Sequence, residues 1–132
     1  MKRYLLALSG LLLATAAQAN DCEKAQTQID VNECYAAQYK KDDLALNQTY
    51  KKVLSIATAE QKDLLKQAQL AWIKVRDADC KFVSSGSEGG TVGPMIYSQC
   101  LSDRTKERTA FLESLMQCEE GDLSCPLPPQ AH

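Results

Sequence analysis

Six cysteines in a short chain constrain this sequence more than any other feature. They are Cys22, Cys34, Cys80, Cys100, Cys118 and Cys125. An even number in an exported chain of this size is typical of a disulfide framework, for which six cysteines allow fifteen pairings. Zinc sites usually draw on close cysteine pairs or on histidines, and the one histidine here is the last residue. We expect no metal site, and bonds between neighbours along the chain: Cys22–Cys34, Cys80–Cys100 and Cys118–Cys125.

The N-terminal segment has the features of a secretory signal peptide and not of a buried helix. Lys2 and Arg3 precede an apolar stretch, and Ala17-Gln18-Ala19 fits the small-x-small pattern of a cleavage site. The stretch is shorter than the roughly 20 residues that a membrane-spanning helix needs. We therefore expect residues 1–19 to be removed and the product to be soluble, in the periplasm or secreted. The context of Cys22 does not match a lipoprotein signal, so no membrane anchor is expected.

The remaining chain, residues 20–132, is long enough for one domain. Without Lys2 and Arg3, 13 of the 15 basic side chains remain against 17 acidic ones, which gives a net charge of about −4. This balance excludes the basic face of a nucleic-acid-binding protein. It suits a basic partner, although ordinary solubility explains it as well. We expect a helical domain over residues 20–118. An acidic turn and a Pro-rich tail follow over 119–132, with 126–132 unstructured.

Three segments with helical patterns and no strand pattern predict an all-α fold. Thr27 followed by Asp30, and Thr58 followed by Gln61, resemble capping arrangements at helix starts. Pro94 suits the first turn of a third helix. We expect helices over residues 27–56 and 60–83, and a third from about residue 92 up to the turn after residue 117. Short connections favour a small antiparallel three-helix domain stapled by disulfides.

Apolar residues at helical spacing predict the inner side of each helix. In the first helix they are Val31, Tyr35, Tyr39, Leu46, Tyr50, Val53 and Ala57. In the third they fall among Ile96, Cys100, Leu101, Thr105, Arg108, Leu112 and Leu115. The second helix has the cleanest pattern, alternating steps of four and three, which we call the apolar stripe: Leu64, Ala68, Ala71, Val75, Ala78 and Phe82. With Leu65 and Trp72 beside it, this stripe is expected to face the core.

Three stretches resemble one known family. They are Asp43-x-x-Leu46-Asn47-x-x-Tyr50, then Ala68-Gln69-x-Ala71-Trp72-Ile73-x-x-Arg76-Asp77-Ala78-x-Cys80, then Gly89-Gly90-Thr91 with Cys100-Leu101, Thr105 and Arg108. Together with Cys22 and Cys34 they resemble the LprI-like lysozyme inhibitor family, over about residues 22–115. The resemblance implies a secreted bacterial helical domain and, for the namesake at least, a role in blocking lysozyme. The namesake is a lipoprotein, and the present chain departs from it in lacking that signal.

The residues of these motifs have a structural and a functional interpretation. We expect Trp72 to pack in the core, with stacking on a ligand as the alternative. Arg76 and Arg108 are expected in a partly buried charge network, because buried charges need partners. The candidate partners are Asp43, Asn47 and Asp77. This network is predicted to build the fold, not to catalyse a reaction.

The glycine-rich loop between the second and third helices is the candidate binding element. It contains Ser85, Ser87, Glu88, Gly89, Gly90 and Thr91. A small-residue tip held at its base by a Cys80–Cys100 bond could enter the cleft of a partner at a reduced ordering cost. Glu88 would present a negative charge to a basic groove. The alternative is that the two glycines only turn the chain into the next helix.

A binding protein fits this sequence better than an enzyme. No internal histidine can act as a general base, and all thiols are expected to be oxidised. The leading hypothesis is an inhibitor that occludes the active site of a basic lysozyme or another peptidoglycan hydrolase, without any cofactor. Two alternatives stay open: an immunity protein against a competitor's cell-wall hydrolase, and a structural or adaptor protein of the envelope.

Overall fold

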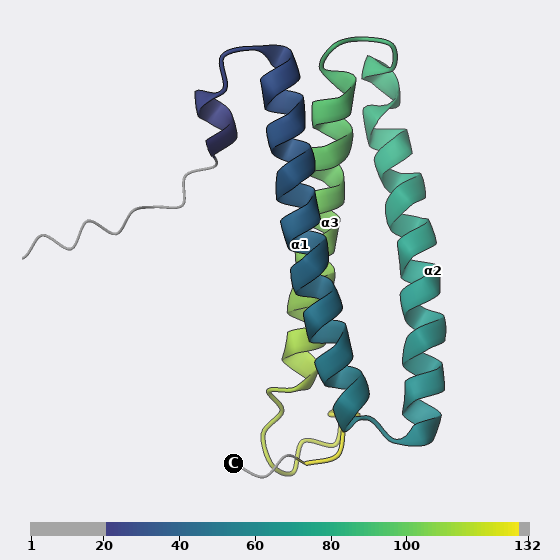
Figure 1. Cartoon of the computed structure of the whole chain (residues 1–132). Coiled ribbons are helices and arrows are strands. Elements are labelled where there is room, and N and C mark those ends of the chain that lie inside the picture. Colours follow the sequence, from purple (N-terminus) through teal and green to yellow (C-terminus); the bar gives the residue numbers. More distant parts are fainter. Residues whose placement is uncertain (1–20, 130–132) are drawn as a thin grey trace, which may run out of the picture.

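A computed structural model describes residues 21–129 and contains three long helices (Figure 1). The elements are η1 (Asp21–Lys24), α1 (Gln28–Ile56), α2 (Ala59–Ser84), η2 (Ser85–Ser87) and α3 (Gly93–Leu115). Consecutive long helices run in opposite directions, so that α1 and α3 run the same way and α2 runs against them. The described residues contain no strand. The predicted all-α, antiparallel three-helix fold is confirmed.

The helix boundaries follow from local capping. The hydroxyl of Thr27 accepts a hydrogen bond from the backbone N–H of Asp30 at 3.1 Å and begins α1. Thr58 and Gln61 form a reciprocal capping box at the start of α2, with distances of 3.2 and 3.0 Å. Pro94 stands in the first turn of α3, where its missing N–H costs little. Each predicted boundary lies within a residue or two of the observed one.

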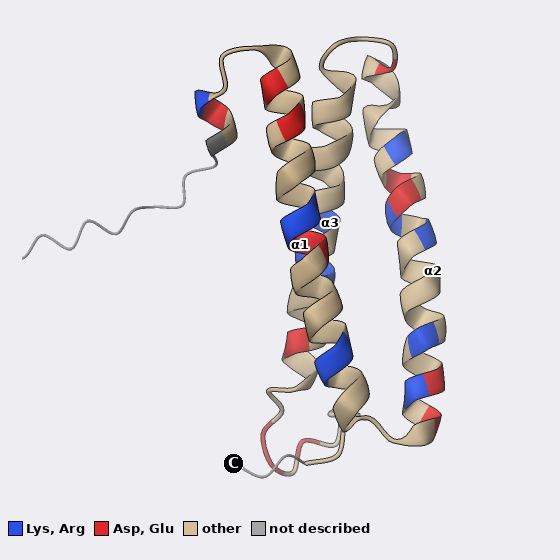
Figure 2. Ribbon diagram, in the orientation of Figure 1, with Lys and Arg blue, Asp and Glu red and all other residues tan. Residues whose placement is uncertain are grey.

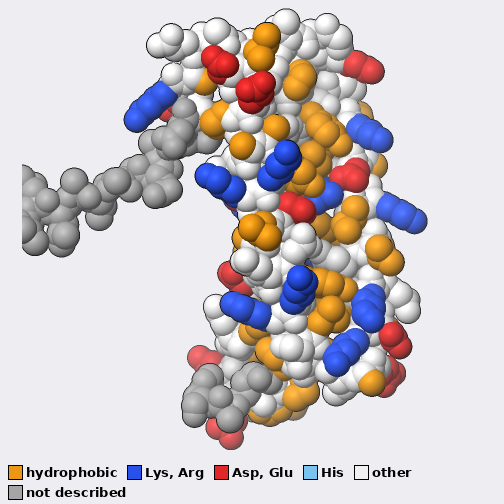
Figure 3. All heavy atoms as spheres, in the orientation of Figure 1, with side chains coloured by type: hydrophobic (Ala, Val, Ile, Leu, Met, Phe, Trp, Pro, Cys, Tyr) orange, Lys and Arg blue, Asp and Glu red, His pale blue; other side chains and the backbone are white. Residues whose placement is uncertain are grey.

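The hydrophobic core lies mainly between α1 and α3. Leu46, Val53 and Leu112 are almost fully buried at its centre. The partly buried residues that pack around them are Tyr50, Leu65, Trp72, Leu115, Met116 and Leu127. α2 packs mainly on α3 and hardly on α1. Figure 3 accordingly shows hydrophobic side chains in view along the line between α1 and α2, with lysines and arginines on both sides.

The apolar stripe of α2 does not face the core, and this part of the sequence-based prediction is wrong. Leu64, Val75 and Phe82 are 60%, 56% and 81% exposed. The three alanines of the stripe are exposed too. The buried residues of α2 are Gln69, Arg76 and Cys80. The inner side is thus marked by a disulfide and by polar side chains that find partners, which a hydrophobicity pattern cannot detect.

Three disulfides join Cys22 to Cys34, Cys80 to Cys100 and Cys118 to Cys125. These are the neighbouring pairs expected from the sequence. The first folds η1 back onto α1, the second ties the end of α2 to α3, and the third closes the segment after α3. Loops of this length contribute about 2–4 kcal/mol per bond by restricting the unfolded chain.

The start of the C-terminal tail is ordered against the core, contrary to the expected unstructured tail. Leu127 packs on the central cluster, and the side-chain amide of Gln61 donates a hydrogen bond to the carbonyl of Pro126. The tail therefore closes the end of the domain where α1 meets α2. The predicted signal peptide and the last three residues lie outside the described residues. Within the described range, the helices are all too polar or too short to cross a membrane.

Two adjacent leucines test the orientation of α2. Leu65 packs on the core cluster, whereas Leu64 is 60% exposed. We expect Leu65→Ala to lower the free energy of unfolding by about 2 kcal/mol, since it leaves a cavity. Leu64→Ala is expected to cost under about 0.5 kcal/mol in dilute protein. Urea unfolding of both oxidised variants measures the difference. Equal losses would contradict the observed rotation of α2.

Candidate functional site

Cationic and aromatic side chains alternate through the middle of the molecule. The guanidinium of Arg76 lies 5.4 Å from the ring centre of Tyr39 and 5.1 Å from that of Trp72. The guanidinium of Arg108 lies 5.7 Å from Trp72 and 5.2 Å from Phe111. We call these five residues the central ladder. It draws residues from all three helices, and each contact of this kind contributes about 0.5–2 kcal/mol.

Arg76 is buried and lies at the junction of the three helices. Its Nε donates to Asp77 at 3.0 Å, and its Nη1 lies 3.6 Å from Asp43 of α1. Nη1 also donates to the hydroxyl of Thr105 of α3, at 3.4 Å. A buried charge is costly unless it is paired and hydrogen-bonded. The two carboxylates are 39% and 41% exposed, so they neutralise Arg76 while they keep much of their own hydration.

Arg108 extends the ladder toward the C-terminal end of α3. Its Nε donates to the side-chain oxygen of Gln69 at 3.0 Å, while its Nη2 is buried without a hydrogen-bond partner. Burial lowers the pKa of Arg108 from its ordinary value. At the other end of the ladder, burial raises the pKa of Tyr39, and the nearby Arg76 only partly opposes this shift. Tyr39 and Arg108 are both half-buried.

The predicted charge network is present, with additional members. Asp43, Trp72, Arg76, Asp77 and Arg108 are brought together by the ladder and its ion pairs. Asn47 differs: it donates only to Asp43, at 3.4 Å, and has no hydrogen bond to either arginine. Sequence reasoning missed three partners: Tyr39, Gln69 and Thr105. Gln69 and Thr105 stand within the quoted motifs, so their place there was the available signal.

The glycine-rich loop has a defined shape at one end of the molecule (Figure 1). Gly89 adopts a φ of +80°, which favours glycine. A Cβ on Gly93 would lie 2.8 Å from the carbonyl oxygen of Ser87, so this close approach also requires glycine. The side chain of Asn32 on α1 donates to the carbonyl of Thr91 at 2.9 Å. The loop is therefore fastened to α1, and the side chain of Glu88 stays exposed.

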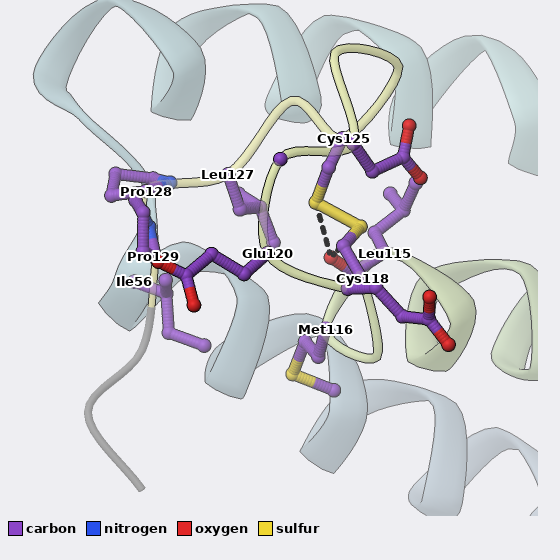
Figure 4. A pocket seen from close by; sticks show the side chains of 12 residues that line it. Ile56, Leu115, Met116, Cys118, Glu120, Cys125, Leu127, Pro128 and Pro129 are labelled. Carbon is purple, nitrogen blue, oxygen red and sulfur yellow. Dashed lines mark hydrogen bonds between the residues drawn. A yellow bond between two sulfur atoms is a disulfide. The ribbon is translucent and has the colours of Figure 1, made fainter.

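The opposite end of the molecule contains a cavity of about 440 Å³ beside the Cys118–Cys125 disulfide (Figure 4). Its apolar lining comes from α1, α3 and the tail, and includes Ile56, Leu115, Met116 and Leu127. The acidic turn forms part of its rim, with Glu119, Glu120 and Asp122. The hydroxyl and N–H of Ser124 lower the pKa of Asp122 by hydrogen bonding to it. Among residues 21–129 no group of His, Cys, Asp or Glu could hold a metal ion.

Removing Arg76 tests the ladder. We expect Arg76→Gln to lower the free energy of unfolding by about 2–3 kcal/mol, since the ion pairs and ring contacts that join the helices are lost. This expected loss of stability is smaller than the loss on breaking a fully buried ion pair, because both carboxylates are partly hydrated.

Arg104→Gln is the matched control. It removes an exposed ion pair of 2.9 Å with Glu107 and should cost under about 1 kcal/mol. Chemical unfolding of the oxidised proteins compares the two variants. A loss in Arg76→Gln no larger than in the control would mean that the ladder does not hold the helices together.

Comparison with known proteins gives the family. The family described as lysozyme inhibitor LprI matches residues 19–112. An uncharacterized protein of Rhizobium meliloti (strain 1021) is 38% identical over 130 residues, covering 84% of this chain and 94% of that protein. An uncharacterized protein of Rickettsia conorii is 49% identical over 35 residues, 24% of this chain and 69% of the relative. No solved structure matches. The chain therefore belongs to the LprI family of lysozyme inhibitors.

Proposed function

We propose that this protein is exported to the periplasm, binds a lysozyme-like peptidoglycan hydrolase and occludes its active site. The observation that carries the proposal is the family match over residues 19–112, since this is a family of inhibitors and not of catalysts. Three disulfides support an oxidising compartment outside the cytoplasm. The mechanism needs no cofactor and no covalent step, because a bound domain blocks the substrate by its volume.

The glycine-rich loop is the proposed contact with the hydrolase. The loop carries small side chains. Because the hydrogen bond from Asn32 already holds it, less conformational entropy is lost when the loop binds. Glu88 is exposed on it, and Asp30 and Glu33 add exposed acidic groups on the first turns of α1 at the same end (Figure 2). Lysozymes are typically basic and have a deep sugar-binding cleft. Charge complementarity would speed association and orient the loop toward that cleft.

Lysis of peptidoglycan by a panel of lysozymes tests this proposal. We expect the purified oxidised protein to inhibit at least one of them in a dose-dependent manner that saturates at a fixed ratio. Glu88→Lys should raise the half-inhibitory concentration by about tenfold or more, because a like charge then faces the basic cleft.

Glu60→Lys provides a control with the same change of net charge. Glu60 is exposed in the first turn of α2, at the end away from the loop. The Glu60→Lys variant should leave the half-inhibitory concentration nearly unchanged. Equal weakening by both variants would assign the effect to overall charge and remove the loop from the interface. No inhibition of any lysozyme would contradict the proposed function and favour the adaptor or immunity role.

A further inference from the structure

The apolar stripe on the outer side of α2 has no partner among the described residues that buries it. Its three large side chains, Leu64, Val75 and Phe82, are 60%, 56% and 81% exposed. The stripe extends over 19 residues of uninterrupted helix, from Leu64 to Phe82, a length of about 27 Å. A continuous exposed apolar surface of this kind marks an interaction site more often than single exposed residues do. Its spacing and its flanking charges indicate what covers it.

The spacing of the stripe is that of a coiled-coil seam. Alternating steps of four and three average 3.5 residues, the repeat with which two helices stay in contact along their length. At 100° per residue, the stripe lies roughly 140° around α2 from the buried residues Gln69, Arg76 and Cys80. The body of the domain is therefore turned away from the stripe, and a second helix can approach it. The alanines at three of the six positions permit a short distance between the helices.

Charges beside the stripe favour a second copy in parallel orientation. In heptad terms, Ala68, Val75 and Phe82 take position a, Lys74 takes position g, and Asp79 takes position e. In a parallel pair, position g of one helix faces position e of the next heptad on its partner. Lys74 of each copy would then face Asp79 of the other copy, forming two ion pairs by symmetry. An antiparallel pair would bring like residues together, Lys74 against Lys74.

We propose that two copies of this chain associate in parallel through the apolar stripe of α2, as a short two-stranded coiled coil. Since α2 is already folded on α3, association does not have to nucleate a helix. The seam is short, so the pair is weak and depends on protein concentration. The parallel orientation places the two glycine-rich loops at the same end of the assembly.

Sedimentation equilibrium of the purified oxidised protein, from about 5 to about 500 µM, tests the pairing. We expect a reversible monomer–dimer equilibrium. Val75→Glu should raise the dissociation constant at least about tenfold, because it places two unpaired charges in the seam. Leu70→Glu introduces the same charge on α2 at a residue that is 64% exposed but outside the stripe, and it should leave the constant unchanged. Circular dichroism checks that both variants remain helical.

Charge reversal tests the orientation. Lys74→Glu should weaken the parallel pair, and the double variant Lys74→Glu with Asp79→Lys should restore it. Lys74→Gln should also weaken a parallel pair, whereas it would strengthen an antiparallel one by removing repulsion. Strengthening by Lys74→Gln would therefore overturn the parallel arrangement.

Two results would overturn the pairing itself: a monomer at every concentration, or a dimer that Val75→Glu leaves intact. Lysozyme inhibition is measured on the same variants as a separate readout. The wild-type protein could stay monomeric while Val75→Glu loses lysozyme inhibition. This result would mean that the stripe contacts the hydrolase and not a second copy. A dimer without any lysozyme inhibition would contradict the proposed function and leave the pairing in place.

Discussion

The position of α2 depends on the burial of Arg76. α1 and α2 hardly pack on each other, so the guanidinium of Arg76 is the group through which α2 reaches both Asp43 on α1 and Thr105 on α3. A charge in such a place is unfavourable unless several partners surround it. Two carboxylates, one hydroxyl and two ring faces provide them here. α2 is thus joined to the other two helices largely by a polar and aromatic ladder, where a ridge of aliphatic side chains would be usual.

This attachment explains why the sequence predicts most of the fold but not the rotation of α2. Caps such as Thr58 with Gln61, the neighbouring cysteine pairs and the apolar faces of α1 and α3 are local patterns, and the structure agrees with them. On α2 the strongest hydrophobic period points outward, because Gln69 and Arg76 occupy the inner side. Their burial is favourable only through partners on other helices. Hydrophobicity along one helix contains no information about those partners, and the same reason applies to the docking of Leu127.

The small core makes the disulfides important to the shape of both ends. Among residues 21–129, the fully buried apolar cluster consists of Leu46, Val53 and Leu112, which is little for a domain of this length. Cys80–Cys100 fixes the separation of α2 and α3 where the glycine-rich loop begins, and Cys118–Cys125 shapes the end that carries the cavity. Each bond acts on the unfolded chain as well as on the native geometry. The shape of the two ends therefore depends on covalent bonds more than on packing.

The polar inner side and the apolar outer side of α2 have related consequences. The ladder provides partners for the polar groups on the inner side of α2. The apolar stripe on the outer side can therefore contact another molecule without disturbing the domain. The stripe ends at Phe82, only three residues before the loop begins at Ser85. In a parallel pair, the loops of two copies would lie at one end, each with an exposed Glu88. Their mutual repulsion would oppose close contact between the loops, while their combined negative charge would attract a basic hydrolase more strongly than one loop alone. The same helix would then connect self-association to target binding through electrostatics.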